Sequence, residues 1–200
     1  YIVPRPGHVF VIADRAQIEP RVLACLCGNQ RLVEDLRNGM PLYEAHARET
    51  MAWTGGPLKK EEPKLYALAK ARVLGLGYGC SAKKFAKVAK NLAALDLTPE
   101  ECVRTVKDFR RRNPLITGLS NRFDRAIGEA AGTDKRLELE LPSGRTVRYF
   151  DVGYEAEKKR YTACTERGGS REGIYGAKLV ENLVQGTARE VFADMLVRLN

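Results

Sequence analysis

The first candidate for chemistry is an aspartate at the end of an apolar run. Residues Val9 to Ala13 are apolar without interruption, and Asp14 follows them directly. Such a run predicts a buried strand. A carboxylate held at the end of a buried strand is a suitable Mg²⁺ ligand, since substrate phosphates can fill the remaining coordination sites. A simpler role also fits, because an aspartate that precedes a helix often caps it.

The second candidate lies along one side of a predicted helix. Lys70, Leu74 and Tyr78 recur every four residues, which places them on neighbouring turns of the same helix side. Lys70 would offer a cation to a triphosphate, and Tyr78 would offer a flat face to a base. On spacing alone, the alternative is an ordinary helix with a solvated lysine and a packed tyrosine.

A helix-rich frame is predicted around these residues. The clearest helix start is Thr98-Pro-Glu-Glu101, which has threonine at the N-cap, proline at the first helical position and glutamate at the third. Apolar residues at helical spacing indicate the other helices. We expect helices over residues 18–27, 41–51, 65–77, 81–90, 98–112, 114–131 and 177–199.

A β-hairpin is predicted in the second half of the chain. Leucines alternate with glutamates over 137–141, a turn follows at Pro142-Ser-Gly144, and alternation resumes at Val147 and Tyr149. The polar, glycine-rich residues 158–173 predict a mobile loop. These elements predict a helix-rich α+β fold, in which the helical and basic segment 52–132 is inserted between two parts of an α+β core.

Composition narrows the possible partners. The formal net charge of +9 suits a polyanion such as nucleic acid, a nucleotide or an anionic membrane, although a soluble basic protein is the simpler alternative. The five cysteines form no C-x-x-C pair and only two histidines are present, which argues against structural zinc and for a reducing, cytoplasmic location. No apolar run is long enough to suggest a membrane span or a signal peptide.

The segment Asp14-Arg-Ala-Gln17-Ile-Glu19-Pro-Arg21 resembles motif A of family A (DNA polymerase I-like) DNA polymerases, whose pattern is Asp-x-x-Gln-x-Glu-x-Arg. All four specified positions match. The resemblance implies that Asp14 and the carbonyl of Arg15 bind two Mg²⁺ ions. It also implies that Gln17 and Glu19 contact the nucleotide, with Glu19 excluding a 2′-hydroxyl, and that Arg21 contacts DNA.

The second candidate resembles motif B, the O helix of the same family, whose pattern is Arg-x-x-x-Lys-x-x-x-(Phe/Tyr)-x-x-x-Tyr-Gly. Lys70 and Tyr78-Gly79 match, whereas Tyr66 and Leu74 replace the arginine and the aromatic residue. The surrounding residues look like the bacteriophage branch of the family. The resemblance implies that Lys70, Leu74 and Tyr78 bind the nucleotide and that Lys70 assists catalysis. Candidate replacements for the arginine are Lys60, Lys64 and Arg72.

Three further segments follow in family order. Tyr43-Glu-Ala-His46 resembles a segment in which the histidine lies near the triphosphate, although a structural histidine fits as well. Glu181 to Ala188 resembles the segment whose glutamine, here Gln185, contacts the minor groove of the primer–template; a role in the helix core is the alternative. Arg110 and Arg111 are expected either to contact template phosphate or to cap a helix.

The implied function is template-directed DNA synthesis in phage replication, with primer–template DNA and deoxynucleoside triphosphates as partners. The implied division is palm over 1–51, fingers over 52–132 with the O helix at about 65–79, and hairpin and palm over 133–200. The family's second catalytic aspartate belongs to a His-Asp pair, motif C, and no such pair occurs here. We therefore expect one set of metal ligands to come from outside this chain, and the isolated chain to be inactive.

Three alternatives remain at this point. The chain, which begins with Tyr1, is expected to be part of a longer product. It could instead be a split-polymerase subunit completed by a partner that carries motif C, or a non-catalytic nucleic-acid-binding protein that retains the fold. A relationship to single-subunit RNA polymerases is disfavoured by Glu19, because ribonucleotides need an open gate.

Overall fold

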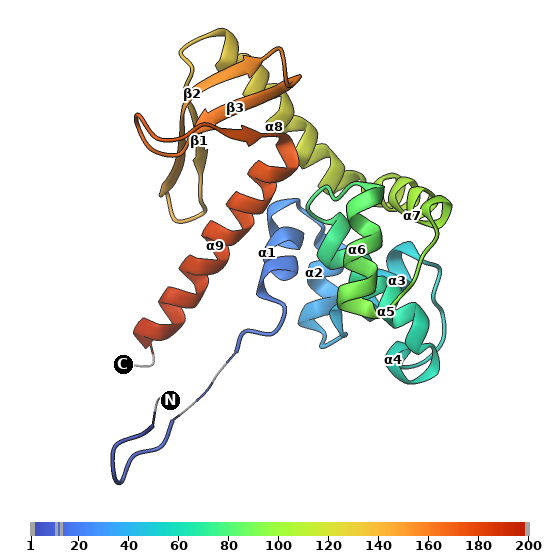
Figure 1. Ribbon diagram of the computed structural model, residues 1–200. Helices are drawn as coiled ribbons and strands as arrows, with labels where there is room; N and C mark the ends of the chain where they lie inside the picture. Colours follow the sequence, from blue (N-terminus) through green and yellow to red (C-terminus); the bar gives the residue numbers. More distant parts are fainter. Residues whose placement is uncertain (1–2, 11, 13, 199–200) are drawn as a thin grey trace.

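Two long helices join a small sheet to a group of shorter helices in the computed structural model, which describes residues 3–10, 12 and 14–198 (Figure 1). These helices are α8 (Pro114–Gly132) and α9 (Gly176–Arg198). They pack against each other, and both also contact the sheet. Helix α9 further contacts α1 (Ile18–Leu26), so it connects the sheet to the segment that carries Asp14.

Most of the predicted helices are confirmed. The capping box at Thr98 forms as expected: its hydroxyl accepts the Glu101 N–H at 3.2 Å, and the Glu101 carboxylate accepts the Thr98 N–H at 2.8 Å. The helices before it are α2 (Gln30–Arg37), α3 (Leu42–Thr50), α4 (Leu58–Glu61), α5 (Pro63–Ala71) and α6 (Ala82–Ala93), and the box itself begins α7 (Pro99–Arg112).

Helix α2 was not predicted, although the sequence carries a signal for it. The Asn29 side chain caps the helix by accepting the Leu32 N–H at 3.0 Å. Apolar residues at 32, 33 and 36 follow at helical spacing and are half-buried. The short helix α4 was likewise missed, because its four residues are too few to show a period.

The helix predicted over 65–77 is confirmed in extent, but its last part is not α-helical. Residues Arg72–Leu76 form a π-helix, η1, that directly continues α5. Gly75 in this segment lies close to Val88 and Phe85 of α6, so a side chain there would collide with Val88. Single π turns inside α-helices are rare and often occur at functional sites.

The sheet has four antiparallel strands in the order β1-β2-β3-β4. The predicted hairpin is confirmed, with Leu139 opposite Val147. The loop predicted over 158–173 is wrong in part, because it contains β3 and the start of β4. Backbone pairing with β2 and β3 organises these short strands despite their weak apolar pattern. The strands are β1 (Leu137–Glu140), β2 (Thr146–Glu155), β3 (Arg160–Cys164) and β4 (Glu172–Ile174).

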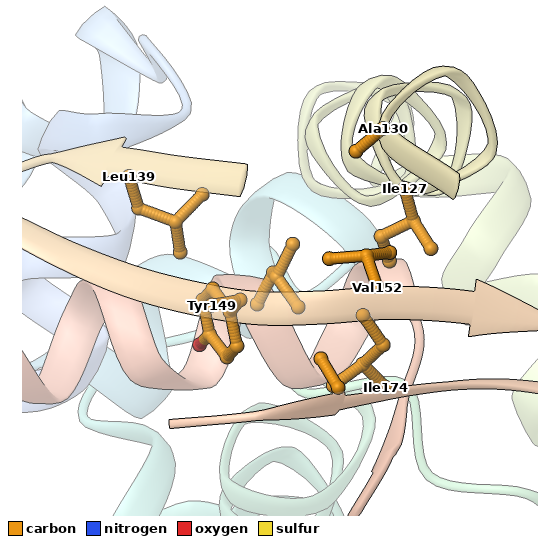
Figure 2. Close-up of a cluster of buried hydrophobic side chains, with 8 residues drawn as sticks. Ile127, Ala130, Leu139, Tyr149, Val152 and Ile174 are labelled. Atoms are coloured by element: carbon orange, nitrogen blue, oxygen red, sulfur yellow. The ribbon is translucent and has the colours of Figure 1, made fainter. Parts of the chain in front are cut away.

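One face of the sheet forms a core with α8 and α9. Figure 2 shows Val152 and Tyr149 of β2 among side chains from α8 and the neighbouring strands. Tyr149 is almost completely buried, and its hydroxyl accepts a hydrogen bond from the Asn182 side-chain amide of α9. A buried hydroxyl needs such a partner, and this bond joins α9 to β2.

The strand predicted over 9–13 is wrong for the residues that the structure describes. Val9, Phe10 and Ile12 lie in irregular chain with highly exposed side chains, whereas residues 11 and 13 lie outside the described residues. An apolar run becomes a strand only when its backbone groups find a ladder partner. No strand of the described part of the chain pairs with this run.

The helix-rich α+β class is confirmed, while the division at 51 and 132 stays a prediction. Helix α8, at the end of the predicted fingers range, packs against α9 and β2. Among the described residues, no helix is long and apolar enough to cross a lipid bilayer.

The turn after η1 provides a test of how α9 is positioned. Gly79 has φ +73°, and a Cβ there would overlap that of Ala177 at the start of α9. Gly144, in the hairpin turn, has φ +83° but open space around it. We expect Gly144→Ala to lower the free energy of unfolding by about 1–2 kcal/mol through backbone strain. Gly79→Ala should cost roughly 1–3 kcal/mol more, because of the added overlap. Urea unfolding of both variants measures the difference, and equal losses would contradict this packing.

The ion pair between η1 and α7 provides a test by pH. Burial alone would raise the pKa of Asp108, but hydrogen bonds from Arg111, Arg112 and Arg72 outweigh it and lower the pKa from 3.8 to about 2. A lowered carboxyl pKa stabilises the fold above about pH 4, and this stabilisation disappears as pH falls toward 2. Asp108→Asn should therefore flatten the loss of unfolding free energy between pH 5 and 2.5.

The control is Asp96→Asn, because the Asp96 side chain is 84% exposed and pairs with the exposed Lys90. It should retain the acid-side loss seen in the unchanged chain. An Asp108→Asn variant with the same slope as the unchanged chain would show that this pair does not contribute.

Candidate functional site

The segment with the motif A pattern forms a tight turn ahead of α1. Asp14 is exposed, and Gln17 adopts a left-handed conformation (φ 57°) at the N-cap. The Arg21 Nε–H donates to the Ala16 carbonyl at 3.2 Å, which holds the turn against the helix. The Arg15 Nε–H lies 3.2 Å from Met195 Sδ, which brings the turn close to α9.

Asp14, Arg15 and Arg21 line one hollow of about 530 Å³. Its other walls come from α1, the hairpin turn and α9, through residues such as Pro142 and Thr187. The structure therefore places three predicted residues around one space. Among the described residues, Asp14 is the only carboxylate in that lining.

Tyr78 brings the two motif-like segments together, because it packs against the apolar cluster that Leu23 of α1 forms with Val180 of α9. The Tyr78 hydroxyl is buried, with no hydrogen-bond partner among the described residues. Burial raises the pKa of this phenol, and the negative charges of Glu19 and Glu181 raise it further. The phenol therefore remains protonated and can act as a donor. Glu181 was not singled out from the sequence, although it belongs to the segment quoted for Gln185.

A second hollow, of about 460 Å³, lies beside Tyr78. Leu74 and Tyr78 line it from η1 and the turn that follows, and Glu181 lines it from α9. Lys84 of α6 and Tyr175, just before α9, complete its rim. Neither of these two residues was predicted; the lysines of α6 were the available signal in the sequence.

Lys70 is half-buried on α5, one turn before Leu74. Tyr66 occupies the position at which the family has an arginine. Its ring packs edge-on against the Tyr43 ring, with the ring centroids 5.5 Å apart. Arg72 does not replace that arginine, because it is buried and paired with Asp108 at 3.1 Å. The remaining candidate replacements, Lys60 and Lys64, are exposed.

His46 lies in the interior rather than at an open surface. It is 4% exposed, and its Nε2 lies 3.1 Å from the Thr50 hydroxyl, which itself donates to the His46 carbonyl. Burial, assisted by the charge of Arg72, lowers the pKa of His46 from 6.5 to about 3, so the ring is neutral at physiological pH. The ring packs beside that of Phe109, as the alternative of a structural histidine expects, and the predicted triphosphate contact stays a prediction.

The residues predicted to contact DNA lie in different surroundings. Arg111 pairs with Asp108 at 2.7 Å, whereas Arg110 lines a third hollow, of about 280 Å³, beside α8. Gln185 is exposed on α9, one turn beyond Glu181. The side chains of Arg110 and Gln185 are therefore accessible to a ligand.

The part of the chain that the structure describes does not hold a complete set of metal ligands. No group of three or more histidine, cysteine, aspartate or glutamate side chains gathers there in a way that could hold an ion. Asp14 is the candidate carboxylate, and a divalent-cation centre at this point requires further oxygen ligands from substrate or from other protein segments.

Comparisons with known proteins agree with the arrangement of these segments. The model of DNA polymerase family A matches residues 1–199. The DNA polymerase of Bacillus phage SP02 is 30% identical over 99% of this chain, and DNA polymerase I of Chloroflexus aurantiacus is 35% identical over 99%. In fold, the chain is similar to the POL domain of Pol1 from M. smegmatis, solved in complex with DNA primer-template and dNTP. That similarity has a TM-score of 0.52 at 21% identity, over 87% of this chain and 26% of that one.

The chain is shorter than these relatives. It spans 34% of the phage polymerase and 18% of the Chloroflexus enzyme. The match nevertheless runs through nearly the whole chain, including both motif-like segments and α9. The chain therefore belongs to DNA polymerase family A.

Proposed function

We propose that this chain forms the nucleotide-binding and part of the catalytic surface of a DNA polymerase that copies a template in phage replication. One observation carries the proposal: Tyr78, in the motif B segment, packs against the same apolar cluster as α1, the helix that carries Glu19 of the motif A segment. In support, the fold relative from M. smegmatis was solved with primer-template and dNTP.

The reaction is attack of a primer 3′-hydroxyl on the α-phosphate of a deoxynucleoside triphosphate, with release of pyrophosphate. Asp14 and the carbonyl of Arg15 are the residues proposed to hold two Mg²⁺ ions, together with a second carboxylate from outside the described residues. When bound, such ions lower the pKa of the attacking hydroxyl and neutralise charge on the phosphates. The open hollow next to Asp14 leaves room for the primer end.

Lys70 and Gln17 are proposed to act on the triphosphate and the sugar. A half-buried ammonium attracts phosphate charge more strongly than a fully solvated one, because less water screens it. Lys70 can also supply a proton to the departing pyrophosphate. Arg21 and Gln185 are proposed to contact the DNA backbone and the minor groove.

Glu19 is proposed to select the sugar. Glu19 is half-buried in the first turn of α1, where its side chain can fill the space that a 2′-hydroxyl would need. A deoxyribose fits such a site, whereas a ribose would collide with the side chain and leave buried polar groups unpaired.

The catalytic role of Asp14 is tested by substitution. Asp14→Asn keeps the size of the side chain but removes the charge, so it should weaken Mg²⁺-dependent dNTP binding about 100-fold, equivalent to a loss of about 3 kcal/mol. Binding of a fluorescent dNTP to the chain with primer–template DNA, with and without Mg²⁺, measures this. Asp96→Asn is the control. Unchanged binding in Asp14→Asn would favour the alternative of a non-catalytic nucleic-acid-binding protein.

Sugar selection is tested at Glu19. Glu19→Ala should reduce the preference for a dNTP over the matching rNTP by roughly 10–200-fold, because the steric obstacle to the 2′-hydroxyl is removed. Competition between the two nucleotides in the same binding assay gives the ratio. Glu34→Ala on the exposed side of α2 is the matched control. A preference that survives Glu19→Ala would rule out this gate.

A further inference from the structure

The helical segment that carries Lys70 and Tyr78 is widened between these two residues. Residues Arg72–Leu76 form the π-helix η1, whose hydrogen bonds span one residue more than those of an α-helix. Each residue of η1 therefore turns through a smaller angle about the helix axis. In a continuous α-helix, two residues eight apart would point about 80° away from each other. The smaller turns of η1 remove most of that angle, which brings Lys70 and Tyr78 close to one side of the helix.

The burial of neighbouring side chains agrees with the widened turn. Ala71 and Leu76 are five residues apart, which in an α-helix would turn them about 140° away from each other. Both are nevertheless buried in one apolar cluster, together with Phe85 of α6 and Phe109 of α7. The π geometry accounts for this, because it brings residues five apart onto one side. The form of η1 is thus tied to its packing on α6 and α7.

Arg72, the first residue of η1, is a charged side chain in the interior. It is 4% exposed, and its Nη2 donates to Asp108 Oδ2 of α7 at 3.1 Å. Its guanidinium lies 5.8 Å from the centroid of the Phe109 ring. Its Nε has no hydrogen-bond partner among the described residues. A buried guanidinium with an unpaired N–H costs stability, so stability alone does not explain an arginine at this position.

Both ends of η1 are held against α7. Arg72 is held at the first residue through Asp108, and Leu76 is held at the last residue in the cluster that contains Phe109. Helix α5 runs directly into η1, so the segment would return to α-helical geometry if one end were released. The reason is that π turns are rare and α turns are the ordinary form of such a helix.

We propose that Arg72 is a positioning residue of the polymerase: its pair with Asp108 keeps η1 in the π form and so aligns Lys70 with Tyr78 on one bound nucleotide. Arg72 does not line the hollow beside Tyr78, so it acts through η1 rather than by touching the substrate. The proposal rests on the proposed function, in which Lys70 binds the triphosphate. It adds a buried residue on which that binding depends.

The anchor is tested by Arg72→Met, which removes the charge but keeps a long side chain. Asp108 retains its hydrogen bonds to two other arginines of α7, so no carboxylate is left unpaired. Arg72→Met should weaken dNTP binding about tenfold, because Lys70 turns away from Tyr78. Binding of a fluorescent dNTP to the chain with primer–template DNA and Mg²⁺ measures this, at a temperature where circular dichroism shows every variant folded.

A double-mutant cycle separates positioning from a general loss of stability. Lys70→Ala should weaken dNTP binding about tenfold in the unchanged chain, but less than about threefold in the Arg72→Met background, where Lys70 is already misaligned. Ile127→Ala, in the core beneath the sheet, is the matched control, because it destabilises the fold away from η1. It should leave the effect of Lys70→Ala unchanged. Equal effects of Lys70→Ala in all three backgrounds would overturn the proposal.

Asp108→Asn is the second variant, and it decides the question if Arg72→Met does not fold. It breaks the same pair from the α7 side, where the Asp108 side chain is 30% exposed and the packing changes less. The effect of Lys70→Ala should again fall below about threefold in this background. A full tenfold effect there would show that the pair does not position Lys70.

Deletion of Arg72 removes the same charge but should preserve the alignment. Lys70 and Tyr78 become seven residues apart, and seven residues of an α-helix end within about 20° of two full turns. Ala71 and Leu76 become four apart, so both can stay buried on one side. The deletion variant should therefore bind dNTP within about threefold of the unchanged chain. A folded deletion variant that binds as weakly as Arg72→Met would rule out alignment as the cause.

Failure of this proposal is distinguishable from failure of the polymerase proposal. If Lys70→Ala leaves dNTP binding unchanged in the chain with Arg72 intact, the role proposed for Lys70 on the triphosphate is wrong, and the positioning role fails with it. If Lys70→Ala weakens binding equally with and without Arg72, only the positioning role is wrong. Mg²⁺-dependent dNTP binding that requires Asp14 would still support the polymerase function in that second case.

Discussion

The close contact between the turn after η1 and the start of α9 is the constraint on which the candidate site depends. Gly79 approaches Ala177 so closely that only a residue without a Cβ fits. This contact brings Tyr78 next to Glu181, while α9 also packs on α1, which carries Glu19. Segments distant in sequence therefore converge because one helix touches all of them.

Charge distribution around Tyr78 explains how the site can be both anionic and able to bind anions. Glu19 and Glu181 lie near the phenol, and burial keeps that phenol protonated. The exposed cations Lys84 and Arg110 line the hollows beside Tyr78 and beside α8. Both carboxylates are half-buried. On the proposal above, Glu19 shapes the space for the sugar, while the exposed cations remain available to phosphates, whose negative charge the carboxylates would repel.

Several individual features were predictable because they depend on neighbouring residues. The capping box at Thr98 and the turn at Gly144 are determined by local hydrogen bonding and by backbone conformation. The strand at 9–13 was not predictable in this way, because an apolar run does not reveal whether a partner strand is present. His46 shows the same limitation: its residue type suits a phosphate contact, but packing beside Phe109 buries it.

The sequence by itself determined the family, since the order and spacing of Asp14, Gln17, Glu19 and Arg21 and of Lys70 and Tyr78 are properties of the chain alone. It also determined most helix positions, through period and caps. Only the tertiary structure decided which candidates are accessible: it buried Arg72 against Asp108 and left Gln185 exposed on α9. Accessibility depends on which surfaces cover one another, and that is set by contacts between distant segments rather than by local pattern.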